Sequence, residues 1–285
     1  ALIARLDATM FEAATILALD HFARERVEWA VLEVGIGGRL DATTVGCPQA
    51  EVITRIDYDH QVFLGWQLEQ IAREKAAILR SGRATAAAQA PEVVQILLAQ
   101  AERAGVPLWL HGRDLAVHVR ARDLSGQRLD FSGPGWGLSD CFVPLLGGFQ
   151  AENALLAVAT VKALGASGVQ VADGAIRQGL ARVSWPGRFQ VLGRDPWVIL
   201  DGAHNPAGAQ ALALALEEYF PGAAKTLIVG ISSDKDKAGI LKALAPLANR
   251  LILTASSNPR ATLPDALWAL LPPSDSRVEV AADVT

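Results

Sequence analysis

Acidic and histidine side chains follow several apolar segments of the chain, at points where a ligand could be bound. Glu33 lies in the apolar run 29–34, directly before a glycine-rich stretch at residues 35–38. A carboxylate in an apolar strand is costly unless it is paired or bound to a metal ion, and glycines allow a ligand to approach the backbone closely. The spacing is not that of a dinucleotide-binding fingerprint followed by a helix. A tight turn with a surface glutamate would give the same pattern, so both interpretations stay open.

A second apolar run, at residues 52–56, leads into Asp59 and His60. These two side chains could bind a divalent ion, or form a carboxylate–histidine pair that orients a ligand. A hydrogen-bonded loop histidine is the alternative. Lys75, with its charged neighbours at 73 and 74, has the pattern of an exposed helix face.

A third apolar run, at residues 198–200, ends in Asp201 and is followed by His204. Asn205 is a favourable N-cap and Pro206 a favourable first residue for a helix that begins here. The free N–H groups at such a helix start attract phosphate or carboxylate. A well-capped turn between strand and helix explains the same residues without a ligand.

Strand-like and helix-like segments alternate along almost the whole chain, which predicts an α/β fold with a largely parallel sheet. Strands are expected at 29–34, 51–56, 116–120, 128–131, 197–200, 226–229 and 251–254, with helices at 9–26, 68–79, 150–164, 171–181, 206–219 and 235–247. A further strand–helix pair is expected within 84–104. Proline and glycine at residues 184–188 predict a linker. We therefore expect a first domain over residues 1–183 and a smaller second domain over residues 189–285.

Composition excludes several classes of protein. Hydrophobic residues make up 51% and charged residues 20% of the 285, as in a folded globular protein. The formal net charge of −4 argues against a nucleic-acid-binding or membrane-surface protein, and no apolar run reaches the roughly 18 residues of a membrane helix. The two cysteines, Cys47 and Cys141, form no disulfide framework, which favours a reduced, cytoplasmic location. A phosphate loop, a zinc-protease motif and a serine nucleophile elbow are absent from the sequence.

Taken together, the segments resemble the folylpolyglutamate synthase / dihydrofolate synthase family of the Mur ligase superfamily. The most specific stretch, residues 32–43, is similar to the family's E-V-G-L-G-G-R-L-D-A-T-N. Further similar segments follow in the family's order at residues 54–60, 71–78, 150–153, 186–190, 200–206, 230–236 and 258–261. The resemblance implies a Mur-ligase-like central domain with a mainly parallel sheet, and a smaller Rossmann-like α/β domain after it.

The resemblance also implies an ATP-dependent amide ligase. ATP would phosphorylate a carboxylate of a folate or dihydropteroate, and the amine of L-glutamate would then displace phosphate from the acyl phosphate. The substrates would be small molecules only, and we expect a cytoplasmic monomer. Catalysis would depend on positioning and on Mg²⁺, and closure of the two domains would assemble the site.

Site residues carry over by matching position. Metal ligands would be Glu33, His60 and Lys75. The lysine would be carbamylated, which turns it into a carboxylate-like ligand. The resemblance therefore also implies a catalytic role for Lys75. The other matches are Asn153, Arg188 and Asp201 for ATP, His204 as a catalytic residue facing the phosphates, and Leu40, Asp41 and Ala42 for the pterin.

The sequence departs from the family's pattern in places. We expect the family's N-terminal phosphate-loop segment to be missing, since it precedes the region where this chain begins, and the C-terminal domain to be cut short at residues 283–285. Thr44, Trp66 and Phe149 replace the family's usual Asn, Asp and His, which affects the expected substrate specificity. Two alternatives stay open: a Mur-type ligase that adds an amino acid to a cell-wall precursor, and a non-catalytic fragment or binding module.

Overall fold

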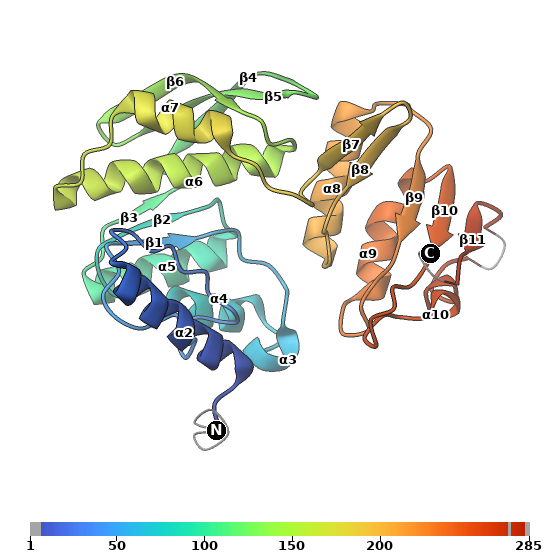
Figure 1. The fold of residues 1–285 in the computed structure, drawn as a ribbon, viewed down its shortest axis with the longest axis horizontal. Helices are drawn as coiled ribbons and strands as arrows, with labels where there is room; N and C mark the ends of the chain where they lie inside the picture. The colour runs from blue at the N-terminus through green and yellow to red at the C-terminus, as the bar shows by residue number, and fades with distance from the viewer. Residues whose placement is uncertain (1–6, 273–274, 283–285) are drawn as a thin grey trace. The chain divides into compact units, whose positions relative to one another are not determined.

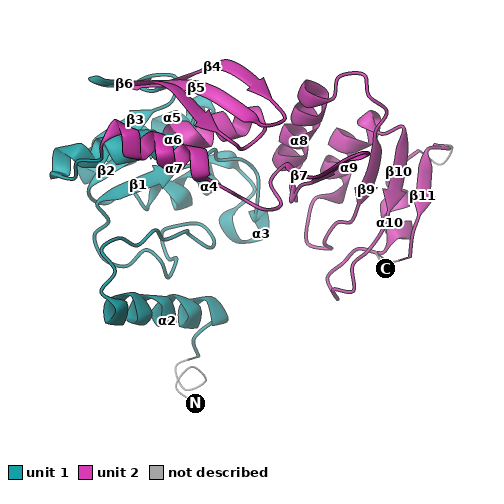
Figure 2. Ribbon diagram, turned by 45° about the horizontal axis from the view of Figure 1, so that its top comes forward, with its two compact units in different colours: residues 1–116, 133–136, 156–171 teal, residues 117–132, 137–155, 172–285 magenta. Residues whose placement is uncertain are grey.

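The computed structural model describes residues 7–272 and 275–282, which form two compact units (Figure 2). Unit 1 contains residues 1–116, 133–136 and 156–171, and unit 2 contains residues 117–132, 137–155 and 172–285. The domain boundary at residues 184–188 stays a prediction.

Unit 1 is built on a three-stranded parallel sheet in the order β1-β2-β3, formed by β1 (Ala50–Ile53), β2 (Arg83–Ala86) and β3 (Leu108–Leu110) (Figure 1). Helices α4 (Leu68–Ala76) and α5 (Pro91–Ala104) pack against each other. Their apolar faces contribute Ile71 and Leu97, both fully buried, to a core shared with the strands. The short helix α3 (Gln61–Leu64) lies between β1 and α4 in the chain and contacts α4.

The N-terminal part of unit 1 confirms one expected element and contradicts another. Helix α2 (Met10–Glu25) begins at the N-cap Thr9, as its amphipathic pattern predicted. The strand predicted at residues 29–34 is wrong, because these residues are among those described and form no strand. A strand requires a backbone partner, and the described sheet ends at β1 without a neighbour on its other side. Val31 is accordingly 97% exposed.

Unit 2 begins with a meander sheet in the order β4-β5-β6, formed by β4 (Ala116–Asp123), β5 (Gly126–Gly133) and β6 (Trp136–Val143). Two-residue connections join these strands, as in antiparallel hairpins. Helix α6 (Gly148–Leu164) gives its first half to unit 2 and its second half to unit 1. The 3₁₀ helix η1 (Gly165–Ser167) follows α6 within unit 1. Unit 2 continues with α7 (Asp173–Arg182) and an antiparallel pair, β7 (Gln190–Arg194) and β8 (Trp197–Leu200).

The C-terminal part of unit 2 is a second parallel sheet, in the order β11-β10-β9. In chain order, this part of the unit contains α8 (Pro206–Tyr219), β9 (Thr226–Val229), α9 (Lys237–Leu244), η2 (Ala245–Leu247), β10 (Arg250–Leu253), α10 (Pro264–Trp268) and β11 (Val278–Val280). Leu253 and Leu267, neither of them exposed, lie in its core. The expected α/β class, with a mainly parallel central sheet and a Rossmann-like C-terminal part, is confirmed. The expected truncation at residues 283–285 falls outside the described residues.

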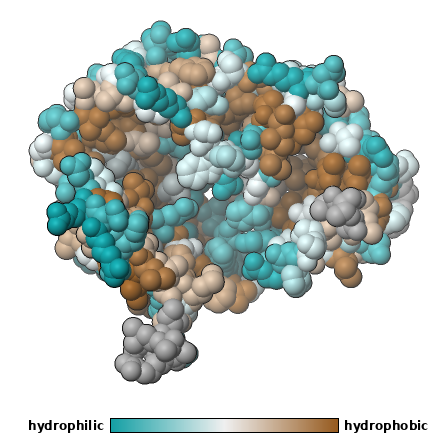
Figure 3. All heavy atoms as spheres, viewed as in Figure 1, coloured by the Kyte–Doolittle hydropathy of each residue, from teal (hydrophilic) through white to brown (hydrophobic). Residues whose placement is uncertain are grey.

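Hydrophilic and hydrophobic side chains are interspersed over the face shown in Figure 3. Among the described residues, no helix has the length and apolar character needed to cross a membrane. The cytoplasmic location and the monomeric state stay predictions.

Candidate functional site

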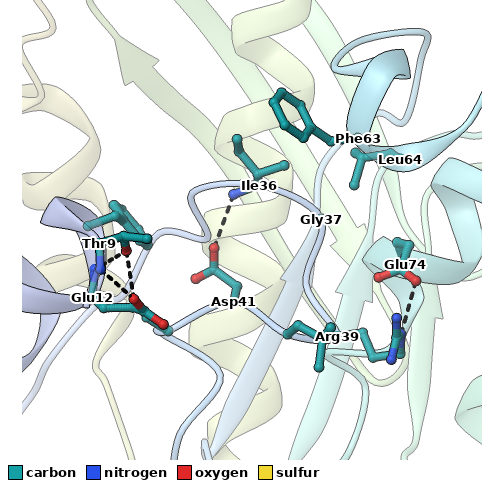
Figure 4. A pocket seen from close by; sticks show the side chains of 12 residues that line it. Thr9, Glu12, Ile36, Gly37, Arg39, Asp41, Phe63, Leu64 and Glu74 are labelled. Atoms are coloured by element: carbon teal, nitrogen blue, oxygen red, sulfur yellow. Dashed lines mark hydrogen bonds and ion pairs between the residues drawn. The ribbon is translucent and has the colours of Figure 1, made fainter. Parts of the chain in front are cut away.

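A pocket of about 370 Å³ lies beside the glycine-rich stretch in unit 1 (Figure 4). Its walls come from the start of α2, the loop at residues 36–42, helix α3 and the end of α4. The lining residues are Thr9, Phe11, Glu12, Ile36, Gly37, Arg39, Leu40, Asp41, Ala42, Phe63, Leu64 and Glu74. The structure therefore brings the three predicted pterin-binding residues to one pocket.

Asp41 holds this loop in shape. One carboxylate oxygen accepts hydrogen bonds from the backbone N–H groups of Gly35 and Ile36, both at 3.0 Å. The other accepts from the N–H of Thr43 at 2.9 Å and from its hydroxyl at 2.6 Å. Burial acts to raise the pKa of Asp41, but the bonds from Thr43, Ile36 and Gly35 outweigh it and hold the pKa below its usual value. The carboxylate thus organises the loop, and its contact with a pterin stays a prediction.

The loop also contacts the last turn of α4. The N–H of Arg39 donates to the carbonyl oxygen of Glu74 at 3.1 Å, and the two side chains form an ion pair at 3.0 Å. Gly38 packs so closely that a Cβ there would lie 2.7 Å from the same carbonyl oxygen. Only glycine fits at this approach without a shift of backbone.

Thr9, Phe11 and Glu12 are pocket residues that sequence-based reasoning missed. Thr9 and Glu12 form a capping box, in which the Thr9 N–H donates to the Glu12 carboxylate at 2.7 Å and the Glu12 N–H to the Thr9 hydroxyl at 3.2 Å. The ring of Phe11 lies against Gly35, where a Cβ would be 2.6 Å from the ring. The T-x-x-E spacing before an apolar helix was a usable signal for the cap, whereas the contact with Gly35 depends on the fold.

Lys75 lies close enough to Asp59 for their charges to interact, and His60 follows Asp59 directly in the chain. Burial lowers the pKa of Lys75, and the charge of Asp59 partly offsets this. The N–H of His60 donates to the Asp59 carboxylate at 2.8 Å, and the His60 carbonyl accepts from Phe63 and Leu64 at the start of α3. Lys75 is only partly exposed. The pattern of charged neighbours had suggested a fully exposed helix face, and the structure does not show that.

Glu33 is the predicted metal ligand that the structure does not join to these residues. It is exposed in the segment 29–34, which has no strand partner. Across the described ranges, no group of three histidine, cysteine, aspartate or glutamate side chains is arranged to hold a metal ion. The roles of Glu33 and His60 as ligands stay predictions.

In unit 2, Asp201 fastens the end of β8 to the turn before β7. Its carboxylate accepts from the N–H of Phe189 at 2.7 Å and from the N–H of Ala203 at 2.8 Å. The N–H of Gly202 donates to the carbonyl of Gly187 at 2.8 Å. Phe189 has a positive φ of 43° and is buried against Tyr219, with ring centroids 5.5 Å apart. This network explains why an aspartate follows an apolar strand here.

Three of the four predicted residues of unit 2 gather at this turn. The Arg188 guanidinium lies against Gly202, 3.6 Å from the position that a Cβ there would occupy. His204 Nδ1 lies 3.0 Å from the Gly202 carbonyl oxygen, and α8 begins directly afterwards. Asn153 lies elsewhere, exposed on α6, and its amide donates to Gln150 at 3.1 Å.

The segments 230–236 and 258–261 also meet at one edge of the C-terminal sheet. The N–H of Ser233 donates to the Arg260 carbonyl at 2.7 Å, and Ser232 forms a bridge with Ala261. Both segments follow the carboxyl ends of parallel strands, where ligands bind in open α/β sheets.

Comparison with known families decides the assignment. Residues 5–161 match the family described as "Mur ligase middle domain", and residues 187–285 match the family described as "Mur ligase, glutamate ligase domain". The chain belongs to the Mur ligase family. Within that family, its resemblance to folylpolyglutamate and dihydrofolate synthases is confirmed by similar proteins of that name.

A curated relative of this Mur ligase is the dihydrofolate synthase/folylpolyglutamate synthase of Mycobacterium tuberculosis, 40% identical over 266 residues, which cover 90% of this chain and 55% of the relative. The folylpolyglutamate synthase of Lacticaseibacillus casei is 34% identical, with coverage of 94% and 63%. The chain thus spans a little over half the length of these relatives.

Solved structures are also similar to this chain in fold. The M. tuberculosis folylpolyglutamate synthase complexed with ADP has a TM-score of 0.90 and 37% identity, covering 99% of this chain and 64% of that one. The Escherichia coli FolC structure in complex with DHPP and ADP has a TM-score of 0.84 and 32% identity, covering 96% and 63%.

Proposed function

We propose that this Mur ligase, as the natural protein, joins L-glutamate to a carboxylate of a folate or dihydropteroate at the expense of ATP. The observation that carries the proposal is the match in sequence and fold over nearly the whole chain to synthases of this name, solved with ADP. The second candidate, a Mur-type ligase acting on a cell-wall precursor, shares the family, but no motif of this chain favours it over the synthases.

The reaction takes place in two steps. A carboxylate oxygen of the folate or dihydropteroate attacks the γ-phosphorus of ATP, and ADP leaves. The glutamate amine then attacks the acyl carbon and phosphate leaves, while the amine loses a proton. Such chemistry depends on positioning and on stabilising the charge of the transferring phosphoryl group.

The pocket of unit 1 is suited to the pterin end of the substrate. Leu40 and Phe63, which are 81% and 75% exposed, give it apolar surface. The hydrogen bonds of Asp41 hold the loop in its conformation. Ala42 is the third residue that we propose to contact the pterin. Apolar walls with a few fixed polar groups are typical of small-molecule sites.

Lys75 and Asp59 fit a magnesium site, provided that the lysine is carbamylated. The lowered pKa of Lys75 increases the fraction of free amine, which is the form that reacts with CO₂. Carbamylation would replace a cation beside Asp59 with an anion, and the two adjacent negative groups would then favour a divalent cation with oxygen ligands. Mg²⁺ would supply charge neutralisation for phosphoryl transfer. We propose Glu33 and His60 as further ligands on the strength of their motifs alone.

Arg188, Asp201 and His204 are suited to a nucleotide. Arg188 supplies a positive charge for phosphate, and Asp201 fixes the turn that carries it. His204 precedes the N-terminus of α8, whose free N–H groups favour anions. We propose Asn153 as a further ATP contact on the strength of its motif.

The experiment is a ligase assay on the natural protein, with ATP, L-glutamate and either dihydropteroate or folate, in wild type and Lys75→Ala. We expect glutamate-dependent ADP release and a glutamylated product in wild type, and neither in Lys75→Ala. Lys242→Ala, an exposed lysine on α9, is the matched control and should keep full activity. Turnover only with a nucleotide-linked cell-wall precursor would favour the Mur-type alternative. Ligand binding without turnover would favour the binding module, and undiminished activity of Lys75→Ala would refute the role of Lys75.

A further inference from the structure

We propose that the Arg39–Glu74 ion pair positions the pocket loop, residues 35–43, against the helical turn that carries Lys75. Arg39 and Glu74 would thus be positioning residues for the ligase reaction, acting through the loop and through Lys75. The proposal rests on the proposed function for the identity of the ligand, whereas the geometry rests on the contacts alone.

Three contacts fasten the loop to one turn of α4. The backbone N–H of Arg39 donates to the carbonyl of Glu74 at 3.1 Å. Arg39 Nε donates to Glu74 Oε1 at 3.0 Å (Figure 4). Gly38 approaches the same carbonyl oxygen so closely that a Cβ would lie 2.7 Å from it. Side-chain, backbone and packing contacts therefore meet at one residue of the helix.

Glu74 and Lys75 project from the helix in different directions. Consecutive residues of an α-helix are about 100° apart around its axis. Glu74 lines the pocket and pairs with Arg39, whereas Lys75 interacts with Asp59. One helical turn thus connects the pocket to the lysine, and a shift of the loop at Glu74 is transmitted to the next residue.

Hydrogen bonds within the loop connect its parts to one another. Asp41 binds the backbone of Gly35 and Ile36 at one side and Thr43 at the other. Thr44 adds a hydrogen bond from its hydroxyl to the Gly38 carbonyl at 2.6 Å. These hydrogen bonds connect the two ends of the loop with its middle, so its attachment to Glu74 bears on where Leu40 and Ala42 lie.

Stability alone is a weak explanation for the pair. The side chains of Arg39 and Glu74 are 57% and 30% exposed, and exposed ion pairs contribute little to the free energy of unfolding. Positional effects are larger, since a displacement of about 1 Å near reacting groups can lower a rate by about a hundredfold.

The test compares Arg39→Glu, Glu74→Arg and the double variant in which the charges are exchanged. We expect each single variant to raise KM for the folate-type substrate and to lower kcat, with kcat/KM reduced about tenfold or more, while KM for ATP stays within about twofold. The double variant should recover most of the loss. Arg250→Glu, which breaks a similarly exposed pair with Glu279 in the C-terminal sheet, is the control and should change none of these constants.

A second measurement, of hydrogen exchange, does not depend on ligase activity. Hydrogen exchange of the amides in residues 35–43 and 71–78 should become faster in both segments in each single variant, and return towards wild type in the double variant. Single variants with unchanged kinetics and exchange, or a double variant no better than either single one, would overturn the proposal. If wild type shows no glutamate-dependent turnover, the proposed function fails, and the exchange measurement decides the positioning proposal by itself.

Discussion

Replacing Asp41 with Asn should loosen the pocket loop of unit 1. Asparagine keeps one side-chain oxygen, which can still accept from Thr43, but it presents an NH₂ group to the N–H donors of Gly35 and Ile36. Two hydrogen bonds to a charged acceptor are lost, each worth about 1.5–3 kcal/mol when fully effective. Because the site is partly exposed, we expect the variant to lose about 2 kcal/mol of unfolding free energy in total, which lowers the Tm of unit 1 by about 5–10 °C.

The same substitution has a signature in its pH dependence. The pKa of Asp41 is lower in the folded chain than in the unfolded one, so its carboxylate stabilises the fold fully above the unfolded pKa, near about 4. That contribution is lost as the pH falls through the folded pKa. The difference in Tm between wild type and Asp41→Asn should therefore be largest near neutral pH and shrink below about pH 4.

Thermal unfolding over this pH range, with hydrogen exchange of residues 35–43 to identify the transition of unit 1, measures both effects. Asp20→Asn, on the exposed surface of α2, is the control and should shift Tm by little, since its ion pair with Arg24 is solvated. Equal Tm values for Asp41→Asn and wild type at neutral pH, or a difference that persists unchanged in acid, would refute the assigned role of the carboxylate.

Three further substitutions test other parts of the structure. Asn205→Ala removes the side-chain cap of α8 and should cost about 1 kcal/mol in urea unfolding, whereas Asn205→Asp should keep most of the stability. Gly38→Ala forces a Cβ to within 2.7 Å of the Glu74 carbonyl oxygen, so the loop must shift; we expect a loss of about 1–3 kcal/mol and weaker binding of folate in equilibrium titration. Leu253→Ala opens a cavity in the C-terminal core and should cost about 2–5 kcal/mol in urea unfolding, whereas Ile228→Ala, 69% exposed on the adjacent strand, should cost much less.

Strong local patterns made several elements predictable. Helix α8 was expected at residues 206–219 and has these bounds, because an Asn–Pro start and a continuous apolar pattern mark it locally. Strand β9 was likewise predicted at its observed residues. Two strands were missed: β3, which has only the three residues Leu108–Leu110, and β7, in which only Val191 and Leu192 are apolar.

The failed strand at residues 29–34 has a different cause. Its apolar composition predicts a buried strand, but strand structure depends on a backbone partner that a local pattern does not reveal. The contacts at the candidate site also depend on partners that a local sequence pattern does not reveal. The types of Asp41 and Asp201 were recognised from motifs, but their hydrogen bonds to neighbouring turns depend on the folded loops. The Arg39–Glu74 pair, 35 residues apart in sequence, was not foreseeable from composition or spacing.

The most direct test of the central claim is glutamate-dependent product formation by the natural protein. Purified protein is incubated with ATP, Mg²⁺, L-glutamate and dihydropteroate or folate, and the products are identified by mass spectrometry. We expect a product heavier by one glutamyl residue, with one ADP and one phosphate formed per bond and none without glutamate. Formation of no such product from either substrate, while the protein is folded and binds ADP, would contradict the assignment as a glutamate ligase.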